Sequence, residues 1–267
     1  MTDVAYNITT VCIGKKYDPL KPDWLQRLEK MCKKTNIHIW SEIDSTILKY
    51  GLKEAWWDVV RLKRNLELLM KEKKPVMHLD MDMIVEKDLI DIVNLPYDFI
   101  ISTEIGGSNA YPKECSSKLG FGICSGLYVI KPSAMKFMLT ILKNMMSYTF
   151  NCYSDQVNIM NYIIKNPHQI VVEEVVLGEK TYKNNIVLID GIKIGVLDFA
   201  MVIRDPILNN GQYANHINVD NVGGVVQFKK YFYADLETLP LTCRCGKKHL
   251  GDTTVCKHLA MRQLKNM

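Results

Sequence analysis

Short apolar runs alternate with longer stretches of helical periodicity along most of the chain. Runs of this kind, bounded by polar residues and glycine, are typical of buried strands. Apolar residues three and four positions apart, with charged residues between them, are typical of helices that cover a sheet. The apolar runs lie at 7–13, 36–40, 75–79, 97–104 and 121–130, and the helical stretches lie at 23–32 and 53–72. This order predicts an α/β fold that begins with a strand, helix, strand unit.

The second half of the chain continues with elements of both kinds. Pro132 and Ser133 begin a predicted helix, and Ser154 or Asp155 caps the next one. The core-facing stripe of the first of these helices consists of Met135, Met138, Leu139, Leu142, Met145 and Met146. Short strands are expected at 170–176, 186–189 and 192–197, and 84–95 is expected to be helix or loop.

The segment 106–122 differs from its neighbours because it is rich in glycine and polar residues. Connections of this length inside a compact domain are usually lids, binding loops or disordered segments. We therefore predict an active-site loop that is mobile without ligand and closes when the ligand binds.

Composition and charge narrow the function classes. The 267 residues are 48% hydrophobic and 24% charged, as in an ordinary soluble globular protein. The net charge of +5 is spread without a dense basic block, which argues against nucleic-acid binding and suits an anionic ligand such as a nucleotide. Eight scattered cysteines and an N-terminus without signal-peptide features predict a reducing, cytoplasmic setting. No run approaches the roughly 20 apolar residues of a membrane span, so only peripheral membrane contact stays open.

The run at 75–79 ends in two carboxylates, Asp80 and Asp82. Open α/β sheets bind their ligands at the carboxyl ends of such strands. In an extended segment, side chains two positions apart share a face, so both carboxylates can reach one hard cation. Oxygen ligands of this kind favour Mg2+ or Mn2+. The alternative is a solvated acidic turn without a metal.

Two other features have both a functional and a structural interpretation. Gly126 lies inside an apolar run, where a missing side chain permits close approach of backbone or ligand, or marks a plain bulge. Arg61, Lys63 and Arg64 lie on the helical stretch at 53–72. They form a solvated helix face or, as the less favoured alternative, contact a nucleotide.

Four motifs follow one another along the chain. They are Asp-Met-Asp at 80–82, Gly-Leu-Tyr-Val-Ile-Lys-Pro-Ser at 126–133, Ser-Asp-Gln-Val-Asn at 154–158, and a late His216 followed by glycine and lysine. In this order they resemble the GT-A nucleotide-sugar glycosyltransferases, closest to the glycogenin and galactosyltransferase-like group. The resemblance covers 8–231. It implies a Rossmann-like mixed, mostly parallel sheet flanked by helices over 1–235, followed by a short extension over 236–267.

The resemblance implies a metal site formed by Asp80, Asp82 and His216. The cation, Mn2+ or Mg2+, would bridge the diphosphate of a nucleoside-diphosphate sugar and stabilise the charge that builds on the leaving oxygens. Lys229 or Lys230 would add a second positive contact to the donor. In the alternative, the two aspartates form a solvated turn and His216 is an ordinary polar loop residue.

The resemblance also assigns residues around the donor. Asp155 would lie beside the transferred sugar and the acceptor, as a base, a hydrogen-bond acceptor or an electrostatic stabiliser; the alternative is a helix cap. Gly126 would line the sugar pocket with the strand end at 102–104. The base and ribose would lie against 12–17, where Tyr17 is a candidate stacking partner. The remaining donor-binding candidates are Cys12, Gly14, Asp80 and Met81.

These expectations define a metal-dependent glycosyltransferase. It would move a sugar from a nucleoside-diphosphate sugar, with UDP as the expected nucleotide, to a hydroxyl group of a glycan or another acceptor. A sugar nucleotidyltransferase is the first alternative, although Gly14, Lys15 and Lys16 are a poor substitute for its glycine-rich loop. A non-catalytic nucleotide-sugar-binding module is the second alternative.

The extension at 236–267 contains a cluster of candidate zinc ligands. A small zinc site would take three cysteines and one of two histidines, from Cys243, Cys245, Cys256, His249 and His258. The Cys-X-Cys spacing is tighter than the usual separation in zinc sites. We therefore expect free thiols on a C-terminal helix, with bound zinc as the alternative.

Overall fold

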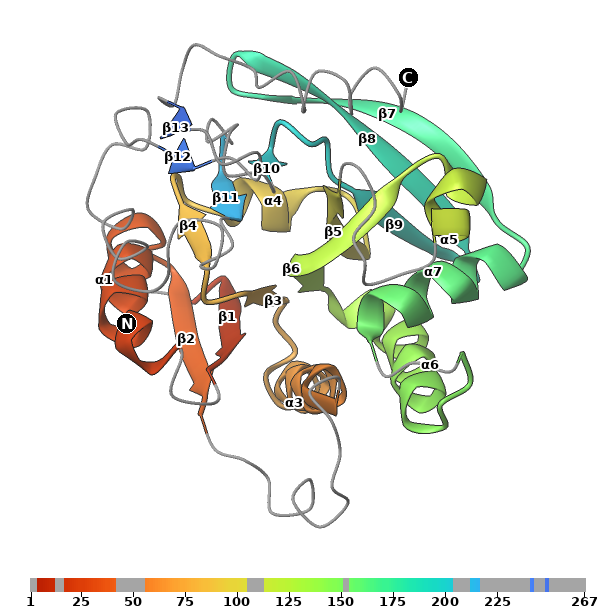
Figure 1. Cartoon of the computed structure of the whole chain (residues 1–267), viewed down its shortest axis with the longest axis horizontal. Coiled ribbons are helices and arrows are strands. Elements are labelled where there is room, and N and C mark those ends of the chain that lie inside the picture. Colours follow the sequence, from red (N-terminus) through yellow and green to blue (C-terminus); the bar gives the residue numbers. More distant parts are fainter. Residues whose placement is uncertain are drawn as a thin grey trace.

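An eight-stranded mixed sheet forms the centre of the molecule, with helices on both of its faces (Figure 1). The strand order is β2-β1-β3-β6-β5-β9-β8-β7, and a separate three-stranded sheet has the order β10-β11-β4. The computed structural model describes residues 4–12, 17–41, 56–104, 113–150, 154–203, 212–216, 241–242 and 248–249.

The first half of the chain builds the strands that position Asp80. Its elements are β1 (Tyr6–Val11), η1 (Asp18–Leu20), α1 (Lys21–Met31), β2 (Thr35–Trp40), α3 (Trp56–Glu72), β3 (Val76–Leu79), β4 (Met83–Val85) and α4 (Ile90–Asn94). β1 pairs in parallel with both β2 and β3. α3 buries Val59, Leu62, Leu66 and Leu69, at the three- and four-residue spacing that predicted a helix there.

The second half completes the sheet and covers both of its faces. Its elements are β5 (Phe99–Glu104), α5 (Lys113–Leu119), β6 (Gly122–Ile130), η2 (Pro132–Ala134), α6 (Met135–Met146), α7 (Asp155–Lys165), β7 (Gln169–Leu177), β8 (Lys180–Ile189), β9 (Ile192–Val196), β10 (Val202–Ile203), β11 (Ala214–His216), β12 (Leu241–Thr242) and β13 (Lys248–His249). β6 lies antiparallel between β3 and β5, and β5 pairs in parallel with β9.

The predicted α/β fold with a mixed sheet flanked by helices is confirmed, with fewer parallel pairings than expected. Three neighbouring pairs of the large sheet are parallel and four are antiparallel. Hairpins need only a short turn, whereas each parallel pair needs a longer crossover. Turns at Gly178 and Gly191, both at positive φ, join β7, β8 and β9 in this way and add an antiparallel ribbon at one edge.

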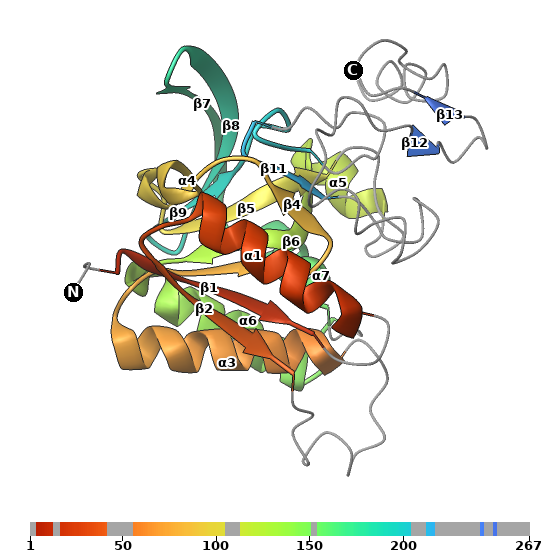
Figure 2. The ribbon, with the colours of Figure 1, turned by 90° about the vertical axis from the view of Figure 1, so that its left-hand side faces the viewer.

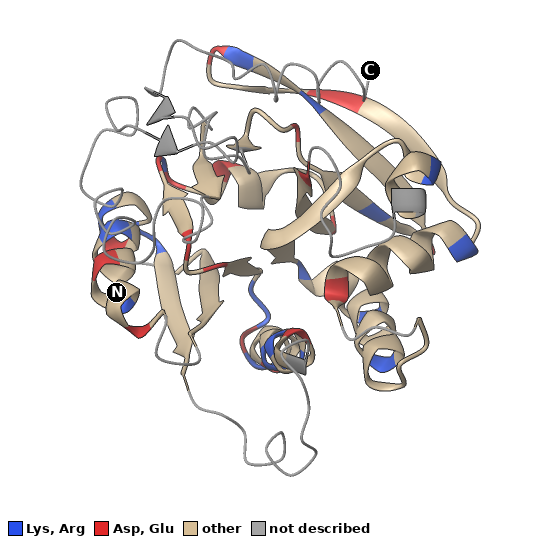
Figure 3. Cartoon of the chain, in the orientation of Figure 1, with Lys and Arg blue, Asp and Glu red and all other residues tan. Residues whose placement is uncertain are grey.

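Two hydrophobic layers hold the helices against the sheet, one on each face. One layer contains Trp24 and Leu28 of α1, and the other contains apolar residues of α3, α6 and α7. Figure 2 shows α1 and α3 on opposite sides of β1 and β2. Side chains alternate along β3, so that Met77 and Leu79 join the α1 layer while Val76 joins the α3 layer. Charged residues lie mostly on helices and turns, and few lie on the central strands (Figure 3).

Three local predictions need correction. The segment 84–95 contains the end of strand β4 as well as α4, and the segment 106–122 contains helix α5. In α6, Leu139 and Met146 are 42% and 54% exposed, while Phe137 and Ile141 are buried. The ring of Phe137 packs against that of Phe99 at a centroid distance of 6.2 Å, which fixes the rotation of this helix. The glycines at 106 and 107 lie outside the described residues, so closure of this loop stays a prediction.

Candidate metal and donor site

The turn after β3 places two carboxylates at the carboxyl end of a central strand. The backbone N–H of Met83 donates to the carbonyl oxygen of Asp80 at 3.1 Å, and the segment 80–82 turns between β3 and β4. The backbone N–H of Asp80 donates to the carbonyl oxygen of Gly126 at 2.8 Å, which ties the turn to β6. The predicted extended backbone is therefore wrong here, and a turn instead brings the two carboxylates together.

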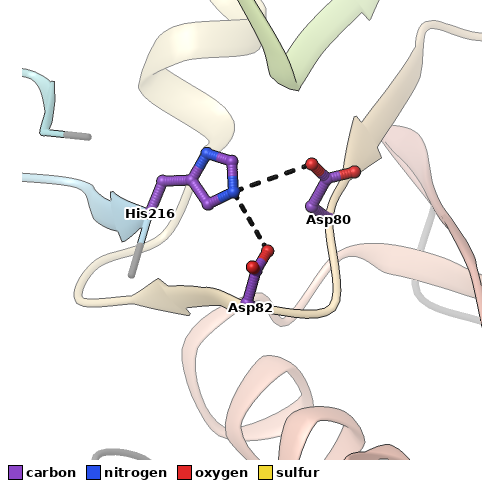
Figure 4. Close-up of side chains that lie close together, drawn as sticks. All are labelled: Asp80, Asp82 and His216. Carbon is purple, nitrogen blue, oxygen red and sulfur yellow. Dashed lines mark hydrogen bonds and ion pairs between the residues drawn. The ribbon is translucent and has the colours of Figure 1, made fainter. Parts of the chain in front are cut away.

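His216 reaches this turn through strand pairing, although it is distant in the sequence. β4 follows Asp82 and pairs antiparallel with β11, and His216 lies opposite Met83 in this register. His216 Nε2 lies 3.0 Å from Asp82 Oδ1 and 3.7 Å from Asp80 Oδ2 (Figure 4). The structure thus brings together the three residues that were predicted as metal ligands, with one donor atom of each within 4.8 Å of the others.

This set of donor atoms fits a divalent cation. Two carboxylate oxygens suit Mg2+ and Mn2+, and an imidazole nitrogen favours Mn2+ of the two. Asp82 and His216 are buried, whereas the Asp80 side chain is 33% exposed. Burial alone would lower the pKa of His216, but its neighbours Asp82 and Cys124 raise it well above its usual value. A cation that binds here therefore displaces a proton from His216.

A bulge in β6 shapes the wall behind His216. The β5–β6 register shifts between Ile101 and Ser102, and bulges next to active sites commonly redirect side chains. A Cβ atom on Gly126 would lie 2.5 Å from both Cε1 and Nδ1 of His216 and 3.2 Å from Asp80 Oδ2. Gly126 therefore lies in the bulge, and its missing side chain also lets the imidazole ring approach the backbone. Both interpretations of this glycine apply. Its expected place in a sugar pocket stays a prediction.

Arg61 of α3 connects three carboxylates beneath this site. Its Nη2 atom lies 2.5 Å from Asp155 Oδ2 and 3.0 Å from Asp58 Oδ1. Its Nη1 atom lies 3.5 Å from Asp80 Oδ1. Arg61 is 7% exposed, so it is a buried cation that links α7 to the turn at 80–82.

The three basic residues singled out on α3 therefore have different environments. Lys63 is 53% exposed and pairs with Glu67 at 3.4 Å, as expected for a solvated helix face. The Arg64 guanidinium lies 5.4 Å above the ring of Trp40. The solvated interpretation is wrong for Arg61. Asp58 could have indicated that Arg61 is buried. The two residues are one helical turn apart, and an acid and a base at this spacing can pair and be buried together beside an apolar stripe.

Asp155 begins α7 and is almost fully buried, with 1% exposed. Its Oδ2 atom accepts a hydrogen bond from Arg61, and its Oδ1 atom accepts one from the backbone N–H of Gln156 at 2.7 Å. Ser154 is the N-cap residue and makes no side-chain capping hydrogen bond. Because both carboxylate oxygens already accept hydrogen bonds, Asp155 is a fixed, ion-paired charge.

His78 of β3 orients the carboxylate of Asp80. Its Nε2 atom lies 3.0 Å from Asp80 Oδ1, while Asp80 Oδ2 faces His216. Burial and the charge of Arg61 lower the pKa of His78, so a neutral imidazole makes this contact. Burial alone would raise the pKa of Asp80, but the hydrogen bond from His78 and the charges of Arg61 and His216 hold it below its usual range. Asp80 is therefore an anion at neutral pH.

The predicted donor contacts at the end of β1 lie at the same edge of the sheet. Cys12 directly follows β1, which runs parallel to β3, so it lies at the edge that carries Asp80, and Tyr17 is the N-cap residue of η1. Cys12 is buried, and burial raises the pKa of its thiol to about 11. Met81 is also buried, so we expect donor contacts of either residue to come from its backbone. The predictions for Gly14, Lys229, Lys230, Cys243, Cys245, Cys256 and His258 lie outside the described residues, as does the side chain of His249.

Comparison with known proteins identifies the fold. No family model and no curated protein matches the sequence. In structure, the chain is similar to a glycosyltransferase involved in the glycosylation of the major capsid of PBCV-1, with a TM-score of 0.55 and 11% identity over 85% of this chain and 98% of that chain. Two structures of the glycosyltransferase GlyE of Streptococcus pneumoniae TIGR4 each give a TM-score of 0.51, with 12% and 13% identity.

The fold is therefore that of GT-A-like glycosyltransferases, as the sequence motifs implied. The chain spans about three fifths of GlyE, at 61% and 60% of the two GlyE chains, and covers nearly all of the PBCV-1 protein. Among the helices that the structure describes, none has the length and apolar character to cross a membrane.

Proposed function

We propose that this chain is a metal-dependent glycosyltransferase. It would transfer a sugar from a nucleoside-diphosphate sugar, with UDP as the expected nucleotide, to a hydroxyl group of a glycan or another acceptor. The observation that carries the proposal is the meeting of Asp80, Asp82 and His216 at the carboxyl end of β3, in a fold shared with glycosyltransferases. This edge of an open α/β sheet is where ligands usually bind.

Asp80, Asp82 and His216 would hold Mn2+ or Mg2+, which would supply the positive charge that stabilises a leaving diphosphate. The protein prepares these ligands before binding. His78 contacts Oδ1 of Asp80, and Gly126 leaves room for the imidazole of His216. Side chains that are already held in place lose little conformational freedom when the ligand binds, which favours affinity.

Arg61 and Asp155 form the second part of the proposed machinery. The family resemblance places Asp155 beside the transferred sugar, and Arg61 holds its carboxylate at 2.5 Å. A buried, ion-paired carboxylate is poorly suited to remove a proton. It is better suited to stabilise the positive charge that develops on the sugar as the bond to the diphosphate breaks. We therefore assign Asp155 an electrostatic role.

Titration calorimetry with UDP and GDP, each with and without Mn2+, tests the nucleotide and the metal together. We expect Mn2+ to tighten UDP binding and to support slow hydrolysis of a UDP-sugar. The nearly isosteric Asp82→Asn should abolish both effects, because it removes an anionic ligand. Glu67→Gln on the exposed face of α3 is the matched control and should change neither.

Two results would redirect the proposal. Full Mn-dependent hydrolysis by Asp82→Asn, with unchanged thermal stability, would remove this residue from the metal site and contradict the proposed mechanism. Release of pyrophosphate from UTP and a sugar 1-phosphate, with formation of the UDP-sugar, would instead indicate a sugar nucleotidyltransferase.

A further inference from the structure

We propose that Cys124 is a positioning residue that fixes the imidazole of His216 with its Nε2 atom toward the cation. This inference rests on the proposed metal site and adds a residue that the sequence motifs did not indicate. Cys124 lies in β6, immediately before the bulge that carries Gly126, and is 2% exposed.

The two nitrogens of the His216 ring have different partners. Nε2 lies 3.0 Å from Asp82 Oδ1, and Nδ1 lies 3.4 Å from the sulfur of Cys124. A neutral imidazole that binds a metal through Nε2 carries its hydrogen on Nδ1, and that N–H needs an acceptor. The Cys124 sulfur is in place to accept this hydrogen bond, which selects the tautomer whose Nε2 lone pair is free for the cation.

The sulfur is itself held in position. The backbone N–H of Gly126 donates to Cys124 Sγ at 3.4 Å. The same glycine lies against the imidazole, because a Cβ atom there would come within 2.5 Å of the ring. One short stretch of β6 therefore limits both the translation and the rotation of the ring of His216.

A thiol suits this position for an electrostatic reason. Metal-bound histidines more often donate their second N–H to a carboxylate or a carbonyl group. A carboxylate here would add a third anion beside Asp80 and Asp82, in a buried place where unpaired charge is costly. With the sulfur of Cys124 as the acceptor, Asp80 and Asp82 remain the two carboxylates that would match the charge of a divalent cation.

Three single variants test this inference in the full chain. Cys124→Ala removes the acceptor, Cys124→Ser restores one, and Cys32→Ala is the matched control. Cys32 is also a buried thiol, at the C-cap of α1. The readouts are Mn2+ and Mg2+ affinity by calorimetry, and the coupling of bound Mn2+ to the nitrogen of His216 by pulsed electron paramagnetic resonance.

We expect Cys124→Ala to bind Mn2+ about 10- to 100-fold more weakly, as is typical when the partner of a metal-bound histidine is lost. Mg2+ affinity should fall less, because imidazole contributes more to Mn2+ binding. At saturating Mn2+ the nitrogen coupling should weaken in Cys124→Ala, be retained in Cys124→Ser, and stay unchanged in Cys32→Ala.

The outcomes separate this inference from the proposed function. If the wild type binds Mn2+ with nitrogen coupling and Cys124→Ala does the same with equal affinity, the role of Cys124 is refuted while the metal site stands. If Cys124→Ser is as weak as Cys124→Ala, the thiol contributes only packing and the inference is also refuted. If the wild type binds no Mn2+, with or without UDP, both proposals fall.

Discussion

The buried charge of Arg61 holds together carboxylates whose proximity the local sequence does not indicate. It lies between Asp58, Asp80 and Asp155, which come from three separate segments of the chain. Around one guanidinium group the three carboxylates leave an excess of negative charge, in keeping with a site prepared for a divalent cation. The pattern of α3 alone predicted a solvated residue, because Arg61, Lys63 and Arg64 were grouped as one basic face of the helix, and charged residues are usually exposed.

Arg61→Ala should destabilise the fold strongly. Removing one partner of a buried ion pair leaves uncompensated buried charge, which typically costs about 3–5 kcal/mol of unfolding free energy. Lys63→Ala, two residues away on the exposed face, should cost less than about 0.5 kcal/mol. Urea unfolding of both variants measures the difference. Equal stabilities would show that the carboxylates around Arg61 relax into solvent without it.

Asp58 should give stability a pH dependence that its variant lacks. Burial and the charges of Asp155 and Asp80 raise its pKa to about 7, against the opposing effect of Arg61. Between the usual carboxyl pKa near 4 and pH 7, the folded protein keeps a proton that the unfolded chain has released. Wild-type stability should therefore fall as pH rises through this window.

Asp58→Asn removes this titration, although it also weakens a contact to Arg61. The unfolding free energy of the variant minus that of the wild type should increase from pH 4 to pH 7 and then level off. Urea unfolding at several pH values measures this difference. A difference that stays constant with pH would place the extra proton on another group.

At the scale of elements, strands with a local signal were predictable and those defined by distant partners were not. β1, β2, β3, β5 and β6 follow from short runs rich in apolar and β-branched residues that end in polar residues. β4 has three residues and pairs with β11, which is also three residues long. Strands of three residues show no periodic pattern of apolar residues, so neither strand, nor their pairing, could be predicted from the local sequence. His216 could be predicted as a metal ligand only through the family resemblance.

The bulge in β6 is the second element that local pattern could not reveal. At the bulge, the imidazole of His216 packs directly against the backbone of Gly126. The substitution Gly126→Ala would place a Cβ atom 2.5 Å from two atoms of this ring. The ring must then move, and forced contacts in packed sites cost about 1–3 kcal/mol. We expect Mn2+ affinity to fall for this reason.

A double-mutant cycle with His216→Ala tests whether this effect passes through His216. In the His216→Ala background the new methyl group meets no imidazole, so Gly126→Ala should change Mn2+ affinity little further. Calorimetric affinities of the two single variants and the double variant provide the cycle. Additive losses would mean that Gly126 acts on the site by another route.

For the whole molecule, the fold class and the order of the first elements followed from the sequence, while the balance of parallel and antiparallel pairing did not. The segment at 170–197 was recognised as strands, and its hairpin turns at Gly178 and Gly191 made it an antiparallel ribbon. The proposed metal ligands come from two sheets, with Asp80 after β3 and His216 at the end of β11. The site therefore exists only when the chain around it is folded.

Because the ligands are assembled by folding, metal and nucleotide should stabilise the native protein as a whole. A ligand that binds only the folded protein adds about 2.7 kcal/mol at 100 times its dissociation constant. Mn2+ with UDP should therefore raise the wild-type Tm by several degrees, and a chelator should reverse the rise. In Asp82→Asn the Tm without ligand should be lower than that of the wild type, because the change removes the charge that pairs with buried His216, and Mn2+ with UDP should no longer raise it. Differential scanning calorimetry measures both values, and an equal rise in the variant would show that the stabilising ligand binds away from the turn at 80–82.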